Sequence, residues 1–484
     1  MTRNLATLLA SGTAALALSA CTATAQTAAP VASAPAVAAP AKQRKAKNVI
    51  MFIGDGMGIS TITAARIYAG QKRGQSGEEY VLPFETFPNV ALVKTYNTDA
   101  QVPDSAGTAT AIHSGVKTRI GMLGIGPEAP RGDCRVGEQH HLPLMGEEAT
   151  RHGKALGIVS TARITHATPA SVYARSVDRD WEADSAIPDS QNGFGCRDIA
   201  RQLVESEFDV ALGGGLGAFY GEDKGGRRAN AGDDLPGDWV RRTGGTFVTT
   251  ANEMSAAPDD GPLLGIFSPS HMTYMADRTG PEGAKSSEPT LTVMTAEALE
   301  RLGRDPDGYY LMVESGRIDH GHHAGQAGYA LEEADEFANA IQYAIDNTDP
   351  DETLILVTAD HSHVFTIAGY PRRGNPILGL VVPPEGGGDD DHAGDTSGPT
   401  LAEDGKPYTT LGYGNGPGAV SGERPVPEAG IAAHQQALVP LGSETHGGED
   451  VALFARGPGA ERARGVIEQN VIYDIVRRAF GWAD

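Results

Sequence analysis

Basic residues are scarce in this chain. It carries 39 lysines and arginines against 62 aspartates and glutamates among 484 residues, a formal net charge of -23. This balance argues against binding nucleic acid or an anionic membrane through a basic face. A small anionic substrate is not excluded, because bound divalent cations can invert the field inside one pocket. We therefore expect no nucleic acid as a specific partner.

The N-terminus lacks a hydrophobic run long enough to cross a membrane. Arg3 precedes a short apolar stretch, residues 5–18, and small residues follow, which is the pattern of an export signal. Leu18-Ser19-Ala20-Cys21 resembles a bacterial lipobox, which predicts a lipoprotein-type signal peptide over 1–20 and a lipid anchor on Cys21. Ala23-Thr24-Ala25 offers a competing cleavage site that gives a soluble product, and a chance Cys21 in an Ala/Ser-rich leader is the third alternative. We expect an exported bacterial protein, either periplasmic or a membrane-anchored lipoprotein.

Cysteine is rare as well, with three in the chain. If Cys21 is lipidated, Cys134 and Cys196 are left either as a disulfide in an oxidising compartment or as two buried thiols. No internal repeat is visible. Residues 21–46 are Ala/Pro-rich and end in a basic cluster, so they read as a flexible linker. The remainder, 47–484, is expected to be the catalytic domain, with a Gly-, Pro- and Asp-rich insertion at about 369–441.

Continuous apolar runs alternate with helical patterns along the domain. This order predicts an α/β fold with a mostly parallel central sheet flanked by helices. The expected strands are 48–53, 155–161, 208–213, 309–313, 353–358 and 450–455. The expected helices are 60–68, 106–113, 196–205, 289–302 and 327–347.

Residues suited to binding metals follow several of these strands. Asp55 follows the first, Thr165 to Thr168 follow the second, Glu314 ends the run at 309–313, and Asp360-His361 end the run at 353–358. Sites in such sheets form beyond the carboxyl ends of the strands, so these side chains are expected to meet at one edge.

Cations are needed if the acids converge. Asp55, Glu314, Asp319 and Asp360 would place like charges in one partly desolvated pocket, which divalent ions would offset. Hard oxygen ligands alone suit magnesium or calcium, whereas the nitrogens of His323, His361 and His446 favour zinc. Asp319 and His323 lie four residues apart, so one helical turn aims both at one ion.

Ser105 stands at the start of an Ala/Thr-rich helix, directly after Asp104. Taken alone, it reads as an ordinary helix cap. A serine hydroxyl is a poor nucleophile unless a base or metal withdraws its proton, and the nearby ligand sets supply that metal. The positive end of the helix also favours a phosphoryl group. The arrangement therefore suits covalent phosphoryl transfer.

At these residues the chain resembles the alkaline phosphatases, from about Lys47 to the C-terminus. The motifs are residues 102–111, 314–323, 358–361 and 444–448, and those of the second half look closer to the animal enzymes. The resemblance implies hydrolysis of small-molecule phosphate monoesters through a phosphoserine on Ser105. It also implies two zinc ions, one magnesium ion, a homodimer, a crown-like region in the insertion and a Cys134–Cys196 bridge.

The resemblance assigns roles by position. Asp319, His323 and His446 would bind the first zinc, and Asp55, Asp360 and His361 the second. Asp55, Thr168 and Glu314 would bind magnesium. His166 and His363 would lie next to the metal ligands without binding an ion directly. Arg179 would grip the phosphoryl oxygens, oriented by Asp104, although an arginine between Asp178 and Asp180 could also be a surface ion pair. His320 and His322 are expected to support the backbone or meet solvent. Ser268 stands where the animal enzymes carry an acidic calcium ligand, which makes a calcium site doubtful.

Two other functions fit the same residues. One is hydrolysis of phosphodiesters or sulfates on this scaffold, although sulfatases generally use a modified cysteine in place of Ser105. The other is a surface protein that binds phosphate or metal without turnover, which predicts lost ligands or a missing nucleophile.

Overall fold

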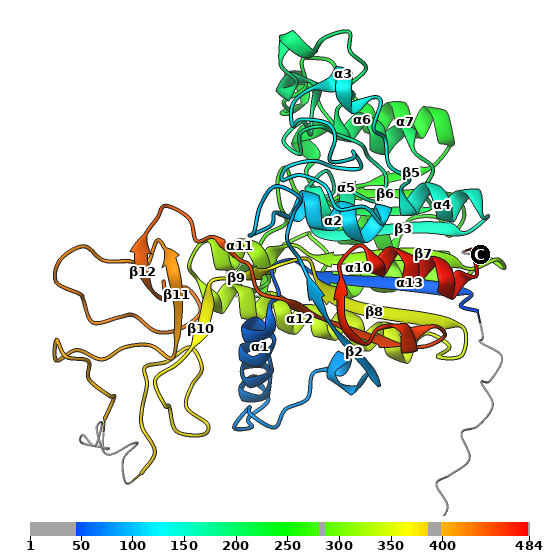
Figure 1. The fold of residues 1–484 in the computed structure, drawn as a ribbon. Coiled ribbons are helices and arrows are strands. Elements are labelled where there is room, and N and C mark those ends of the chain that lie inside the picture. Colours follow the sequence, from blue (N-terminus) through cyan, green and yellow to red (C-terminus); the bar gives the residue numbers. More distant parts are fainter. Residues whose placement is uncertain (1–44, 280–285, 386–397, 483–484) are drawn as a thin grey trace, which may run out of the picture. The chain divides into compact units, whose positions relative to one another are not determined.

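The computed structural model describes residues 45–279, 286–385 and 398–482. Their main feature is a ten-stranded sheet in the order β15-β2-β14-β8-β1-β7-β3-β4-β6-β5 (Figure 1). Among these strands only β14 is antiparallel to its neighbours, which confirms the expected mostly parallel sheet. The strands are β1 Asn48–Gly54, β2 Asn89–Lys94, β3 Ala155–Arg163, β4 Val210–Gly214, β5 Thr246–Val248, β6 Leu263–Ile266, β7 Tyr309–Ser315, β8 Thr353–Ala359, β14 Val451–Arg456 and β15 Gly465–Glu468.

The central strands are apolar throughout because both of their faces are covered. In β7 and β8 every residue is buried, and in β1 only Asn48 is partly exposed. Helices cover the sheet in two groups, with α10 and α12 packed together and α2 packed against α5 and α13. The helices are α1 Ile59–Lys72, α2 Ser105–Ser114, α3 Cys134–Gly137, α4 Met145–Arg151, α5 Ala167–Ala170, α6 Ile199–Glu205, α7 Leu235–Thr243, α8 Ala251–Ser255, α9 Met275–Thr279, α10 Leu291–Leu302, α11 Arg317–His323, α12 Ala327–Asp346 and α13 Val471–Phe480.

Local capping sets where the predicted helices begin. The helix expected at 196–205 begins only at Ile199, because the Asp198 side chain accepts a hydrogen bond from the Arg201 amide and so caps it. The helix expected at 106–113 begins one residue earlier, at Ser105, with Asp104 as its cap.

A second, smaller sheet takes two of its three strands, β11 Leu411–Gly416 and β12 Gln436–Pro440, from the region predicted as an insertion, whereas β10 Phe365–Ile367 precedes that region. Its order is β10-β11-β12, and it lies to the left of the main sheet in Figure 1. Two short strands, β9 Ser362–His363 and β13 His446–Gly447, pair with each other. The boundaries of the domain, 47–484, and of the insertion, about 369–441, stay predictions.

Cys134 and Cys196 form a disulfide, with their Cα atoms 5.4 Å apart. This is the bridge that the resemblance implied. The signal peptide over 1–20, the lipid anchor on Cys21 and nearly all of the linker 21–46 lie outside the described residues. None of the helices in the described ranges combines the length and the apolar character needed to cross a bilayer.

Candidate active site

The ends of four neighbouring strands bring the predicted ligands together. In the sheet register, Gly54 of β1 lies opposite Ser315 of β7 and Ala359 of β8. The residues beside this row are Asp55, Glu314 and Asp360, so their carboxylates share one edge of the sheet. All three are fully buried.

The first group of donor atoms joins α11 to β13. The Asp319 Oδ1 atom lies 3.3 Å from the Nε2 atoms of both His323 and His446, and these two nitrogens are 3.1 Å apart. Each histidine donates from Nδ1 to a backbone carbonyl, His323 to Glu444 and His446 to Pro103. A neutral imidazole carries one N–H, so both Nε2 atoms present lone pairs to the same point. Two imidazole nitrogens and a carboxylate oxygen that converge in this way can serve as ligands of a cation.

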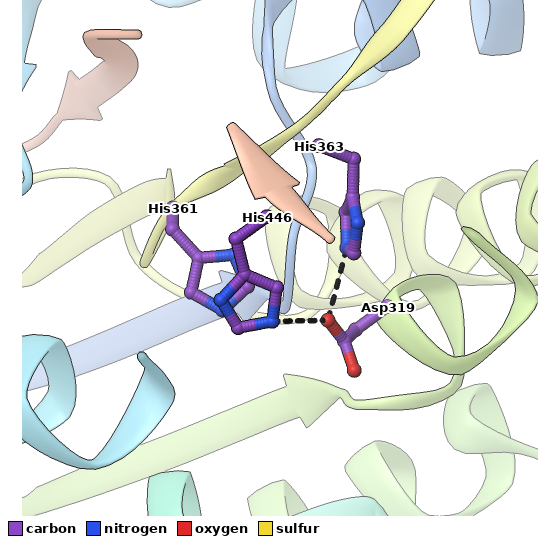
Figure 2. Close-up of side chains that lie close together, drawn as sticks. All are labelled: Asp319, His361, His363 and His446. Atoms are coloured by element: carbon purple, nitrogen blue, oxygen red, sulfur yellow. Dashed lines mark ion pairs between the residues drawn. The ribbon is translucent and has the colours of Figure 1, made fainter. Parts of the chain in front are cut away.

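His363 lies next to this group and contacts two acids, of which Figure 2 shows Asp319. Its Nε2 is 2.9 Å from Asp319 Oδ1, and its Nδ1 is 2.6 Å from Glu444 Oε2. Burial lowers the pKa of His363, but the hydrogen bonds that its ring donates to Asp319 and Glu444 outweigh burial and raise the pKa to about 9. His363 therefore orients Asp319 rather than offering a free lone pair.

The second group lies at the ends of β1 and β8. The His361 Nε2 atom is 3.3 Å from Asp55 Oδ1 and 3.4 Å from Asp360 Oδ2. Asp360 is fixed through Oδ1, which accepts hydrogen bonds from the amides of Gly56 and His361. Burial lowers the pKa of His361 well below its usual range, so its imidazole is neutral and can bind a metal. The rings of His361 and His446 stack with centroids 3.6 Å apart, which brings the first and second groups together.

A third group consists of oxygen atoms without protein partners. Asp55 Oδ2, Thr168 Oγ1 and Glu314 Oε1 are buried and accept or donate no hydrogen bond. The other Glu314 oxygen accepts from the Ser160 hydroxyl. Asp55, Glu314 and His166 also lie close enough to hold one ion. Buried polar atoms are nearly always paired, so three oxygen atoms without a hydrogen-bond partner are suited to binding a cation.

The electrostatics of this edge point the same way. Burial, followed by the charges of Asp360 and Asp319, raises the pKa of Asp55 well above its usual range. Burial likewise raises the pKa of Asp360, and that of Glu314 to about 7. These shifts show acids that the chain itself leaves without sufficient counter-charge.

Ser105 faces the second group. Its Oγ lies 3.1 Å from His361 Nε2 and 3.4 Å from Asp55 Oδ1. Asp104 caps the helix through the Gly107 amide and also binds Arg179, whose Nη1 is 3.0 Å from Asp104 Oδ2. The other terminal nitrogen of Arg179 donates to His166 Nε2 at 2.9 Å. The structure thus sets the guanidinium against Asp104, not against Asp178 or Asp180.

Ser105 and Arg179 line a cavity of about 280 Å³. The sequence reasoning missed three further lining residues, Arg163, Asp180 and Glu182. A signal for Arg163 existed, because it ends β3 only three residues before His166.

Two histidines differ from the expectation. His320 lines the cavity, and His322 is fully buried between the Thr61 hydroxyl at 3.0 Å and the Tyr413 hydroxyl at 2.8 Å. Neither sits in a loose turn, because the Gly/His run forms the helix α11.

Comparison with known proteins decides the family. The family model described as Alkaline phosphatase matches residues 46–481, nearly the whole described chain. The chain belongs to the alkaline phosphatase family. The tissue-nonspecific alkaline phosphatase of Gallus gallus is 45% identical over 463 residues, which cover 89% of this chain and 83% of that protein. The tissue-nonspecific isozyme of Homo sapiens is 43% identical over 460 residues, covering 90% and 83%.

Solved structures of alkaline phosphatases share the fold. The enzyme of Thermus thermophilus superposes with a TM-score of 0.65 at 24% identity, covering 91% of this chain and 92% of the other. The chain is therefore an enzyme, a metal-dependent hydrolase of phosphate monoesters, built on the alkaline phosphatase fold. The roles of individual site residues stay predictions.

Proposed function

We propose that this alkaline phosphatase works through a phosphoserine on Ser105, with zinc at the first and second donor groups and magnesium at the third. The observation that carries the proposal is the position of Ser105 Oγ, 3.1 Å from His361 Nε2 at the edge where the unpartnered carboxylate oxygens gather.

The donor sets fit these ions. Asp319, His323 and His446 would hold one zinc, and Asp55, Asp360 and His361 the other, because imidazole nitrogens favour zinc. Asp55, Thr168 and Glu314 offer oxygen only, which suits magnesium. When bound, such ions lower the pKa of a nearby hydroxyl or water and offset charge on phosphoryl oxygens.

The chain's own groups position the reaction. Ser105 Oγ loses its proton to solvent and attacks phosphorus, the bond to the alcohol oxygen breaks, and that oxygen takes up a proton from solvent, so that the alcohol leaves neutral. Arg179 binds non-transferred phosphoryl oxygens with its planar fork while Asp104 fixes its orientation. The first amides of α2 add donors at the same point. Water then attacks the phosphoserine, which releases inorganic phosphate and restores the hydroxyl.

The proposal also covers the export, membrane anchoring and oligomeric state of the enzyme. We infer export from the leader pattern of residues 1–20, and anchoring through Cys21 from the lipobox. A homodimer follows from the family resemblance.

Ser105→Ala tests the covalent route. Turnover of a phosphate monoester should fall at least roughly a thousand-fold, since the nucleophile is lost. Zinc and magnesium contents, measured by mass spectrometry of the purified protein, should stay near those of the wild type. Ser114→Ala, at the far end of the same helix, is the matched control and should keep its activity. Near-wild-type activity in Ser105→Ala would refute the phosphoserine. A phosphorylated Ser105, trapped at low pH and found by peptide mass spectrometry, would support it.

A further inference from the structure

The cavity beside Ser105 contains a second arginine that the proposed reaction does not use. Arg163, at the end of β3, lines this cavity together with Arg179 and Glu182. Its side chain is 21% exposed, whereas that of Glu182 is 6% exposed. A substrate in the cavity therefore meets the guanidinium more readily than the carboxylate.

Glu182 fixes the orientation of this guanidinium. It accepts from Arg163 Nε at 2.8 and 2.9 Å and from Nη2 at 2.6 Å. The Thr165 hydroxyl, at 2.5 Å, holds the carboxylate in turn. The remaining terminal nitrogen of Arg163 contacts His271 Nε2. Each terminal nitrogen carries a second hydrogen, so N–H donors remain for another partner.

The charges around Glu182 do not cancel. Glu182 is shared by two guanidinium groups, because Arg227 Nη2 also lies 3.1 Å from it. Asp180, which also lines the cavity, is 77% exposed and shares Arg131 with Asp178, at 3.2 and 2.8 Å. Two guanidinium groups therefore face one carboxylate on the Arg163 side of the cavity, which leaves one positive charge there for an anion.

We propose that Arg163 is a specificity-determining residue that favours phosphate monoesters whose leaving group carries a second negative charge, and that Glu182 limits this preference. The proposal rests on the proposed function, because it concerns the leaving group in the Ser105 cavity. It names a carboxylate or second phosphoryl group on the alcohol portion of the substrate as the partner of Arg163.

Two substrates with one ring test the idea. The kcat/KM for 4-carboxyphenyl phosphate is divided by that for phenyl phosphate, and each variant's ratio is divided by that of the wild type, which cancels intrinsic reactivity. Arg163→Met should lower this ratio roughly three- to five-fold, the worth of one partly screened charge contact. Glu182→Gln, which frees the guanidinium but keeps the side-chain shape, should raise it by a similar factor. The rise should shrink in high salt.

Arg163→Met is expected to lower the kcat/KM ratio and Glu182→Gln to raise it. A merely structural role of this ion pair would not give changes in opposite directions. Glu147→Gln breaks an ion pair of similar length, to Arg175 at 2.6 Å, that does not line this cavity, and should leave the ratio unchanged. Shifts of Arg163→Met and Glu182→Gln in the same direction, or no shift in Glu182→Gln, would overturn the proposal. If the wild type hydrolyses neither substrate, the proposed function fails first, whereas good turnover with an unmoved ratio refutes only the role of Arg163.

Discussion

Two regions of this enzyme bring several acids together around buried positions, and they compensate them in different ways. In the Arg228 cluster, Asp184, Asp198 and Asp233 surround a guanidinium whose side chain is 1% exposed, at 3.1, 2.9 and 3.1 Å. In the carboxylate edge, defined here as Asp55, Glu314, Asp319 and Asp360, no lysine or arginine ion pair is formed within the described residues. The cluster is complete as a folded chain, whereas the edge is complete only with added cations. Buried acids without a lysine or arginine partner therefore mark the functional site.

Replacing one acid of the edge should have the largest effect. Asp360→Asn removes a charge from the second donor group, so zinc binding and turnover should fall together, turnover by roughly a thousand-fold. The metal-stripped variant should nevertheless be more stable than stripped wild type, because burial already raises the pKa of Asp360 and the amide needs no counter-charge. Denaturant unfolding of the variant and the wild type, with and without zinc, measures the stability of the metal-stripped proteins and the stabilisation that zinc adds. If metal-stripped Asp360→Asn were less stable than metal-stripped wild type, the carboxylate edge would not differ from the Arg228 cluster in this respect.

Removing the cation of the Arg228 cluster should give the opposite stability result. Arg228→Met leaves three acids without their partner and should cost about 3–5 kcal/mol of unfolding free energy. The folded variant should keep its bound zinc. Arg241→Met breaks an exposed pair with Asp238 and should cost less than about 1 kcal/mol. Equal stabilities of the two variants would show that the cluster does not depend on its guanidinium.

Glu333 in α12 sharpens the comparison, because it is a buried acid outside both regions. Its Oε1 accepts from the Met275 amide at 2.6 Å, and burial raises its pKa to about 7 although Arg278 opposes the shift. A folded pKa above the unfolded value of 4.5 means that unfolding free energy is lost as pH rises from about 4.5 to 7. Glu333→Gln imitates the protonated acid, so it should stabilise the enzyme by up to about 3 kcal/mol at pH 8 and by nothing near pH 4.5. Unfolding curves of both proteins across this range check the sign, and a constant difference would contradict it.

Much of the fold was readable from the sequence because its signals are local. The runs at 309–313 and 353–358 became β7 and β8 with ends extended by one or two residues, since a strand buried on both faces is continuously apolar. The sequence did not show that β14 runs antiparallel, because strand direction depends on how the chain returns to the sheet. Helix starts also moved where a cap such as Asp198 decided them.

The candidate site was readable where one strand end or one helical turn carries the residues. Asp360-His361 and the pair Asp319 and His323 are of this kind. The contact between Glu444 and His363 joins residues 81 positions apart, and no local sequence pattern indicates it.

The sequence by itself determined which chemical groups this enzyme has and which strand ends deliver them, because apolar periodicity and residue type are written locally. Only the tertiary structure decided which of those groups lack a partner. It placed Arg228 among the three aspartates, left the carboxylate edge without such a cation, and set Arg163 beside Ser105. The reason is physical: a charge is compensated by whatever side chain packing brings within a few ångströms, and that depends on register and packing rather than on sequence distance.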